Sequence, residues 1–323
     1  MAHNKTDTFY DLTPDCIHRA FESAGLELEP TITFLNSLEN RVVRVQDVEG
    51  ERWVGKFYRP GRWTKDALLE EHDFLYELLE EGIPVVAPVR LKGGSTLGSI
   101  EGIWFCLFPY HIGRPCDEVD PPLAYQVGHL VGRMHRIGED GRFRNRPTLG
   151  PQYWAGQALQ VLEKERVVPE TLCPRYRQTV QHILQKVERA FAQAHSLRIH
   201  GDLHKGNLLP SSLGLKIVDL DDCGTGPAVQ DLWLLVSGRD AESVDLRELM
   251  LEGYQSVHPF DRRQLELIEP LRALKFVHYA AWLAKRRNDP AFQRRFSDVD
   301  SHGFWRREPE ELEQQLRYLS RSD

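Results

Sequence analysis

The spacing of apolar residues changes once along this chain, near residue 120, and that change limits the folds open to it. Before this point, short runs of β-branched and aromatic residues, separated by glycine and proline, predict strands around a single helix. After it, apolar residues recur every three or four positions over long stretches, which predicts helices. We therefore expect an α+β fold of two lobes, a sheet plus one helix over residues 1–109 and a mainly helical lobe over residues 110–323.

The first lobe is predicted to open with a hairpin formed by residues 42–45 and 52–58, because the residues between them are turn formers. Thr64 is expected to cap the helix that follows, and Gly82 to end it. The remaining strands of this lobe are predicted over residues 85–91 and 100–108.

The second lobe is predicted to be helical over residues 121–134, 176–191, 245–254, 265–287 and 309–319. Between the second and third of these helices, residues 197–202 and 215–219 predict a hairpin whose turn spans residues 210–214. This hairpin contains the densest group of polar side chains in the chain.

Charge and composition exclude several classes of protein. The net charge is −7, which argues against a protein that coats nucleic acid. The longest strongly apolar run, Ile103–Phe108, is too short to cross a bilayer, and the first fifteen residues lack the apolar core of a secretory signal. The five cysteines are scattered and form no C-x-x-C pair, which predicts thiols rather than disulfides. We therefore expect a cytoplasmic protein that binds neither nucleic acid nor a membrane. We also expect a monomer, although the sequence carries no pattern that reports its oligomeric state.

One segment holds most of the candidate chemistry. His200, Asp202 and Asn207 follow the spacing H-x-D-x4-N, and Asp219 comes twelve residues after Asn207. An aspartate can receive the proton of an attacking hydroxyl, and an amide and a second carboxylate supply the oxygen ligands that Mg²⁺ prefers. The segment therefore favours phosphoryl transfer.

This spacing resembles the catalytic loop of kinases, with Asp219 in the place of their metal-binding aspartate. Three further features resemble kinase motifs and occur in the expected order. They are the strand sequence that ends in Lys56, Glu71 on the following helix, and Asp231-Leu232-Trp233 after the loop.

The loop sequence His-Gly-Asp-Leu-His-x-Gly-Asn is similar to that of the aminoglycoside- and choline-kinase-like branch. Within that branch the chain resembles bacterial stress-response kinases of the RdoA or YihE type, over most of its length from Phe9 to Trp305. The segments that carry the resemblance are residues 35–42, 56–60, 70–72, 226–233, 269–273 and 281–283.

The resemblance implies a bilobal protein-kinase-like fold with ATP between the lobes. It also implies a serine/threonine protein kinase of a bacterial stress response that depends on ATP and Mg²⁺. Asp202 would accept the proton, and Asn207 and Asp219 would hold the metal, Asp219 being also a catalytic residue. The implied nucleotide contacts are Ser37 in the phosphate-covering loop, Lys56 on the α- and β-phosphates, Glu71 as the partner of Lys56, and Phe108 and Tyr110 in the hinge that meets adenine.

The phosphate-covering loop, residues 36–40, departs from the kinase pattern because it contains no glycine. The Ser37 hydroxyl and loop amides could replace the missing backbone approach, and Ser37 could also be a site of autophosphorylation. Glu70 stays open as an alternative to Glu71, although the apolar stripe of the helix favours Glu71.

The roles of Asp221 and Asp222 are open, since they could bind a cation or form a solvated acidic turn. Two alternative functions also remain. One is a kinase for a small molecule such as an aminoglycoside, choline or homoserine, and the other is a nucleotide-binding scaffold without catalysis.

Overall fold

The computed structural model describes residues 9, 11–212, 214–296 and 301–320, and the chain divides into two compact units. The first unit combines the residues up to Asp117 with Arg144–Arg146 and Lys205–Asp221. The second unit combines Glu118–Phe143, Pro147–His204 and the residues from Asp222 onward. The predicted lobe boundary after residue 109 stays a prediction.

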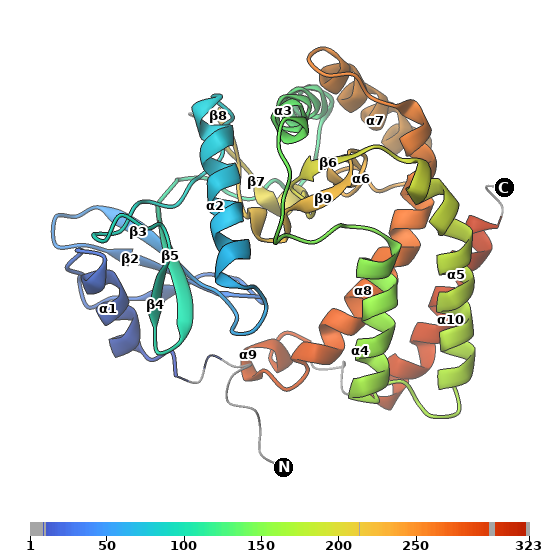
Figure 1. Cartoon of the computed structure of the whole chain (residues 1–323), viewed down its shortest axis with the longest axis horizontal. Helices are drawn as coiled ribbons and strands as arrows, with labels where there is room; N and C mark the ends of the chain where they lie inside the picture. Colours follow the sequence, from blue (N-terminus) through green and yellow to red (C-terminus); the bar gives the residue numbers. More distant parts are fainter. Residues whose placement is uncertain (1–8, 10, 213, 297–300, 321–323) are drawn as a thin grey trace. The chain divides into compact units, whose positions relative to one another are not determined.

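The first unit is built on a five-stranded antiparallel sheet with the strand order β1-β2-β3-β5-β4 (Figure 1). The strands are β1 (Thr33–Phe34), β2 (Arg41–Gln46), β3 (Arg52–Phe57), β4 (Gly98–Ile100) and β5 (Ile103–Pro109). The predicted hairpin is confirmed as β2 and β3. Its turn is shaped by the Asp47 carboxylate, which accepts hydrogen bonds from the backbone N–H groups of Glu49 and Glu51.

One helix covers each face of this sheet. Helix α1 (Pro14–Ser23), which the sequence analysis did not predict, packs on the face that carries Phe105 and Leu107 of β5. Helix α2 (Lys65–Glu80) follows the Thr64 cap as predicted, and its Leu68 packs against Cys106 on the opposite face. Successive residues of β5 therefore supply two separate cores.

The prediction of a strand over residues 85–91 is wrong, because only Val85 forms an isolated bridge there. Pro84 and Pro88 have no N–H group to donate to a strand ladder. The strand expected from residue 100 instead begins at Ile103. Positive φ angles at Glu101 and Gly102, 49° and 76°, turn the chain between β4 and β5.

The segment with the polar motif also pairs differently from the prediction. In the first unit, β7 (Leu208–Ser211) pairs with β8 (Gly214–Ile217). In the second unit, β6 (Ser196–Ile199) pairs with β9 (Gly224–Pro227). The predicted pairing of residues 197–202 with 215–219 is therefore wrong.

The reason is that residues 208–211, expected to lie in a loop and turn, form a strand. Pro210 was expected to begin the turn, but it lies within β7. Closing the short loop between β7 and β8 costs less chain entropy than closing a longer one, so the nearer partner is favoured.

The second unit is mostly helical. Its helices are α3 (Pro121–Glu139), α4 (Gln157–Glu165), α5 (Cys173–Gln193), α6 (Gln230–Trp233), α7 (Ala241–Gln255), α8 (Ile268–Arg286), α9 (Pro290–Gln293) and α10 (His302–Leu319). Helix α3 packs along α7, and α8 packs against α4, α5 and α10. In the part of the chain that the structure describes, no helix has the length and apolar character needed to span a bilayer.

Four of the five predicted helices are confirmed in place, as α3, α5, α7 and α8. The fifth was expected to start at Pro309, yet α10 starts seven residues earlier and contains that proline. Its cap is Ser301, whose hydroxyl accepts a hydrogen bond from the backbone N–H of Phe304.

Glu308 on α10 is a buried acid held by Tyr176 of α5. The tyrosine hydroxyl donates to Oε1 at 2.9 Å, while Oε2 has no hydrogen-bond partner among the described residues. Burial raises the pKa of Glu308 from its ordinary value of 4.5 to about 8. Over that range the folded chain holds a proton that the unfolded chain has released, so stability should fall as the pH rises from 4.5 to about 8.

Replacing Glu308 with glutamine should remove this loss of stability with rising pH. Between about pH 5.5 and about pH 8.5, the melting temperature of the wild type should fall more than that of Glu308→Gln. Glu310→Gln, on the exposed face of the same helix, is the matched control and should follow the wild type. The prediction would be contradicted if the melting temperatures of the wild type and Glu308→Gln, measured by differential scanning calorimetry, changed equally with pH.

Candidate active site

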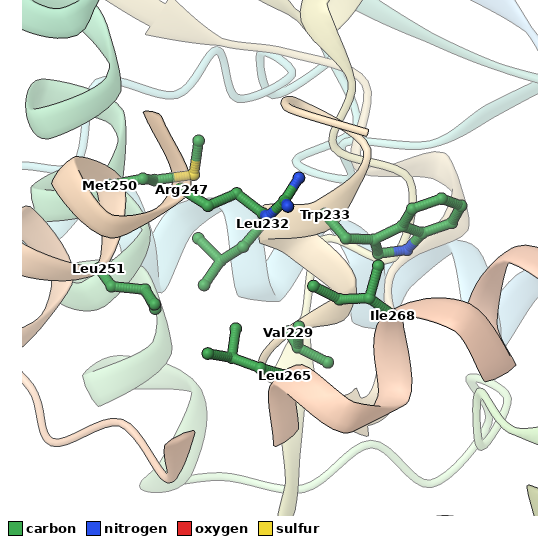
Figure 2. Close-up of a pocket in the computed structure, with 8 residues that line it drawn as sticks. All are labelled: Val229, Leu232, Trp233, Arg247, Met250, Leu251, Leu265 and Ile268. Carbon is green, nitrogen blue, oxygen red and sulfur yellow. The ribbon is translucent and has the colours of Figure 1, made fainter. Parts of the chain in front are cut away.

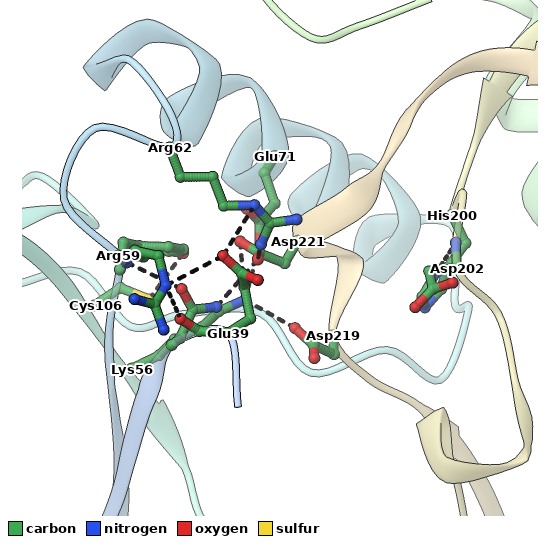
Figure 3. A network of polar contacts seen from close by, with 12 residues as sticks. Glu39, Lys56, Arg59, Arg62, Glu71, Cys106, His200, Asp202, Asp219 and Asp221 are labelled. Carbon is green, nitrogen blue, oxygen red and sulfur yellow. Dashed lines mark hydrogen bonds and ion pairs between the residues drawn. The ribbon is translucent and has the colours of Figure 1, made fainter. Parts of the chain in front are cut away.

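Lys56 lies on β3, on the sheet face that α2 covers, and is 6% exposed. Its Nζ atom is 2.9 Å from Asp219 Oδ1, 3.4 Å from Asp221 Oδ1 and 3.6 Å from Glu71 Oε1 (Figure 3). Burial by itself would lower the pKa of Lys56, but the three carboxylates outweigh it and hold the pKa well above its usual range. The lysine is therefore charged and fixed at the centre of an acidic cluster.

Of the two adjacent glutamates on α2, Glu71 is the one near Lys56. Glu71 is buried, and burial raises its pKa to about 7 against the opposing effect of Lys56. Glu70 instead accepts hydrogen bonds from the backbone N–H groups of residues 144–146. The two neighbours thus have different tasks, one facing the lysine and the other holding a loop of the same unit.

Asp219 follows β8 in a backbone conformation unusual for a residue with a side chain, with φ at 65°. Asparagine and aspartate tolerate this left-handed region better than other residues. Its side chain is 53% exposed, in contrast to the buried Asp221. The carboxylate therefore contacts Lys56 and still faces solvent.

Asn207 ends the 3-10 turn Lys205–Asn207, and its backbone carbonyl accepts a hydrogen bond from the N–H of Val218 at 3.0 Å. This bond ties Asn207 to the residue just before Asp219. An amide and a carboxylate are oxygen donors of the kind that suits Mg²⁺, so the two residues fit that metal, with water and phosphate oxygens as further ligands. No group of three or more His, Cys, Asp or Glu side chains suited to a metal occurs among the described residues.

Asp221 is a site residue whose place the sequence analysis left open. Its carboxylate pairs with the Arg62 guanidinium and accepts a hydrogen bond from Asn40 Nδ2 at 3.0 Å. Burial would raise the pKa of Asp221, but Arg62, Lys56 and Arg146 outweigh it and lower the pKa below its usual range. The only sequence signal was its position two residues after Asp219, which by itself also fits a solvated turn.

The loop of residues 36–40, which was expected to cover phosphate and has no glycine, is held by side chains. Arg59 Nε donates to the Glu39 carbonyl at 2.9 Å, and the Arg59 backbone N–H donates to Asn40 Oδ1 at 3.1 Å. The Glu39 carboxylate lies 3.5 Å from the Nε atoms of both Arg59 and Arg62 (Figure 3). Ser37 is half-buried in this loop, and its backbone N–H donates to the Leu35 carbonyl.

Replacing Asn40 with alanine should loosen the loop and the acidic cluster together. The change removes an acceptor for Arg59 and a donor to the buried Asp221, a loss of about 1–3 kcal/mol of folding stability. For a nucleotide bound as the resemblance implies, we expect the KM for ATP to rise about five- to tenfold with a smaller change in kcat, in steady-state assays. The exposed Asn288 offers the control Asn288→Ala, which should leave both constants unchanged. An unchanged KM in Asn40→Ala would show that the loop is held without this bond.

The two expected hinge residues lie at the end of β5. Phe108 pairs with Val54 of β3, and the Tyr110 backbone N–H donates to the Arg52 carbonyl at 3.1 Å. The guanidinium groups of Arg44 and Arg52 lie 5.8 and 5.9 Å from the centre of the Tyr110 ring. The role of Phe108 and Tyr110 in contacting a nucleotide stays a prediction.

In the second unit, Asp231 of the kinase-like segment Asp231-Leu232-Trp233 braces the loop that carries Asp202. Its carboxylate accepts hydrogen bonds from the backbone N–H groups of His200, at 2.7 Å, and Gly201, at 2.8 Å. A third bond, at 3.0 Å, comes from His135 Nε2, which must carry the proton because a carboxylate only accepts. Gly201 has a φ of 84°, and a Cβ there would lie 2.2 Å from the Asp222 carbonyl, so the turn requires glycine.

Asp202 itself is paired with a lysine that the sequence analysis did not identify. Lys275 Nζ on α8 lies 2.7 Å from Asp202 Oδ1, and His204 Nε2 lies 3.8 Å from Oδ2. Burial would raise the pKa of Asp202, but Lys275 outweighs it and lowers the pKa to about 2. The carboxylate is therefore charged throughout the physiological range.

A small apolar pocket lies in the second unit (Figure 2). Its lining residues are Val229, Leu232, Trp233, Arg247, Met250, Leu251, Leu265 and Ile268. A volume of about 10 Å³ leaves room for one water molecule at most, so it is no site for a nucleotide or an acceptor.

Comparison with known proteins decides the family. The family described as "Phosphotransferase enzyme family" matches residues 31–268. The chain belongs to that family. This phosphotransferase is 38% identical over 320 residues to stress response kinase A of Escherichia coli strain K12, covering 98% of this chain and 96% of the relative. It is also 38% identical over 315 residues to serine/threonine protein kinase RdoA of Salmonella typhimurium, covering 97% and 95%.

Among solved structures, the phosphotransferase is similar to amicoumacin kinase hAmiN in complex with AMP-PNP, Ca²⁺ and Ami. The TM-score is 0.74 at 22% identity, with 91% of this chain and 92% of the other covered. This likeness confirms the α+β kinase-like fold class. The resemblance to stress-response kinases of the RdoA type is confirmed by the identity over nearly the whole chain.

Proposed function

We propose that this phosphotransferase is a serine/threonine protein kinase of a bacterial stress response that uses ATP and Mg²⁺. The observation that carries the proposal is the 2.9 Å contact between Lys56 and Asp219, because it joins a buried, charged lysine to a carboxylate that still faces solvent. The lysine suits the neutralisation of phosphate charge, and the carboxylate would hold the metal beside it. The relative named serine/threonine protein kinase RdoA supports a protein acceptor.

In this proposal each residue has one task. Lys56 binds the α- and β-phosphates, and Glu71 and Asp221 keep its ammonium group in position. Asn207 and Asp219 would hold Mg²⁺, which when bound neutralises charge on the phosphates. Ser37 contacts the nucleotide from the loop, and the backbone of the hinge, including Phe108 and Tyr110, meets adenine.

Asp202 is the proposed proton acceptor for the attacking hydroxyl, a role that requires the charged carboxylate, and Lys275 holds that carboxylate in place. His200 and Gly201 need not move during the reaction, since Asp231 holds their backbone. The remaining parts of the proposal are a cytoplasmic monomer and autophosphorylation at Ser37.

The test incubates the purified protein with Mg²⁺ and ATP labelled at the γ-phosphate. Casein serves as a generic protein acceptor, and choline, homoserine and kanamycin serve as small alcohols. Label on casein or on the chain itself supports the proposal, and mass spectrometry of the labelled chain locates the site at Ser37 or elsewhere. Label on a small alcohol alone would replace it with a small-molecule kinase. A protein that binds ATP without consuming it would be a non-catalytic scaffold.

A further inference from the structure

Lys275 of α8 contacts the loop that carries Asp202. No sequence motif indicated this contact. The side chain of Lys275 is 22% exposed, and Nζ lies 2.7 Å from Asp202 Oδ1. The two residues are 73 positions apart in the sequence, so the contact is created by the packing of the second unit.

Both ends of this contact are held in place by their surroundings. On α8, Leu271 and Leu274 are fully buried, so the helix cannot rotate Lys275 away without exposing apolar surface. On the loop, Asp231 fixes the backbone on the N-terminal side of Asp202. The distance between ammonium and carboxylate is therefore set by packed elements rather than by two mobile surface side chains.

The side chains that lower the pKa of Asp202 belong to two elements, α8 with its lysine and the loop of Asp202 itself with its histidines. Lys275 is the strongest of them, followed by His204 and His200, and all three favour the charged carboxylate. The carboxylate is 32% exposed, so solvent and an acceptor can still reach it. A fixed positive charge thus stands beside the proposed proton acceptor.

We propose that Lys275 is a positioning residue for phosphoryl transfer, which orients the Asp202 carboxylate and disfavours polycationic acceptors beside it. The inference rests on the proposed function in one respect, the role of Asp202. In the transfer, the acceptor oxygen bonds to the γ-phosphorus while the bond to the β,γ-bridging oxygen breaks and ADP leaves. The hydroxyl proton passes to Asp202 and then to solvent. Lys275 stays protonated throughout and acts only through the carboxylate.

The substrate class follows from the charge of Lys275. A carboxylate that binds a polycationic acceptor needs a negative charge that no other group has paired. The carboxylate of Asp202 is already paired with the ammonium group of Lys275 at 2.7 Å. A second cation at the same place would meet like-charge repulsion. The acceptor that fits is an uncharged hydroxyl, as on serine or threonine in a protein, rather than the hydroxyl of a polycationic sugar.

The first test is a double-mutant cycle that compares Lys275→Gln, Asp202→Asn and the variant with both changes. Lys275→Arg is added as the conservative change. Lys275→Gln should lower kcat about 10- to 100-fold and leave the KM for ATP within about twofold, and Lys275→Arg should recover part of the loss. In the Asp202→Asn background, Lys275→Gln should cost less than about twofold. Multiplied losses in the double variant would show that Lys275 acts independently of Asp202 and would overturn the inference.

The matched control is Lys285→Gln, which removes the same charge from the exposed end of the same helix and should leave kcat unchanged. Thermal melting of every variant separates a loss of folding from a loss of positioning. Lys275→Gln should also lower the inhibition constant of kanamycin at least threefold, since the repelling charge is gone. An unchanged inhibition constant would overturn the claim about acceptors.

A measurement that needs no activity keeps the inference separate from the proposed function. Carbon-13 NMR of aspartate-labelled protein can follow the Asp202 carboxyl, which is identified by the loss of its signal in Asp202→Asn. In the wild type its pKa should be near 2, and in Lys275→Gln it should rise, because burial is then no longer outweighed by the lysine. An unshifted pKa would overturn the role of Lys275 whether or not the protein phosphorylates other proteins. If only a small alcohol accepts label, the proposed function fails, and the same variants are compared on that alcohol.

Discussion

Replacing Asp202 with asparagine should lower the turnover number roughly 10²- to 10⁴-fold while ATP binding stays nearly intact. Asparagine keeps the size of the side chain, but it cannot accept the proton of the attacking hydroxyl. The residue also loses its charge beside Lys275, so some rearrangement at that contact is expected. The measurements are kcat with the acceptor that the labelling test identifies and the dissociation constant of ATP from calorimetry.

The control for this variant is Asp245→Asn, which changes an exposed aspartate on α7 of the same unit. It should leave turnover and ATP binding at the wild-type level. Turnover within about threefold of the wild type in Asp202→Asn would remove Asp202 from the role of proton acceptor. A large loss of ATP binding would instead assign the residue to the nucleotide.

Replacing Asp219 with alanine should abolish the part of nucleotide binding that depends on Mg²⁺. The change removes one of the two proposed metal ligands and also the carboxylate 2.9 Å from Lys56. In isothermal titration calorimetry, the wild type should bind ATP far more tightly with Mg²⁺ than without it. For Asp219→Ala the two conditions should give the same weak affinity, because phosphate charge is then opposed by Lys56 without the metal.

Asp11→Ala, at an exposed position of the same unit, is the matched control and should keep the full effect of Mg²⁺. Because Asp219 already adopts a left-handed backbone, melting curves are needed to show that the alanine variant is folded. A folded Asp219→Ala protein that still gained affinity from Mg²⁺ would place the metal on other residues.

Local features of this fold were predictable because local chemistry determines them. The β2–β3 hairpin and the Thr64 cap depend on residues a few positions apart, and both predictions hold. The strand expected over residues 85–91 failed because an apolar run was given more weight than the prolines in and beside it. The predicted start of α10 is wrong for a related reason. Proline is common in the first turn of a helix, but Pro309 lies inside this one.

In the candidate site, too, the features set by local sequence were predictable and the contacts between distant residues were not. The spacing from His200 to Asn207 is local, so it identified Asp202 and Asn207 without a structure. The contact of Arg62 with Asp221 joins residues 159 positions apart, and that of Lys275 with Asp202 joins residues 73 positions apart. A single sequence has no pattern that reports such pairs, because packing of distant elements brings them together.

The arrangement around the loop of residues 36–40 also bears on how this enzyme could be redesigned. Lys56, Arg59 and Arg62 lie within one stretch of seven residues, and the loop that the two arginines hold is residues 36–40. A chimera that exchanged only the loop for a glycine-rich one would leave both guanidinium groups without Glu39. The two segments therefore have to be transplanted together as one block, and recombination between them would separate parts that depend on each other.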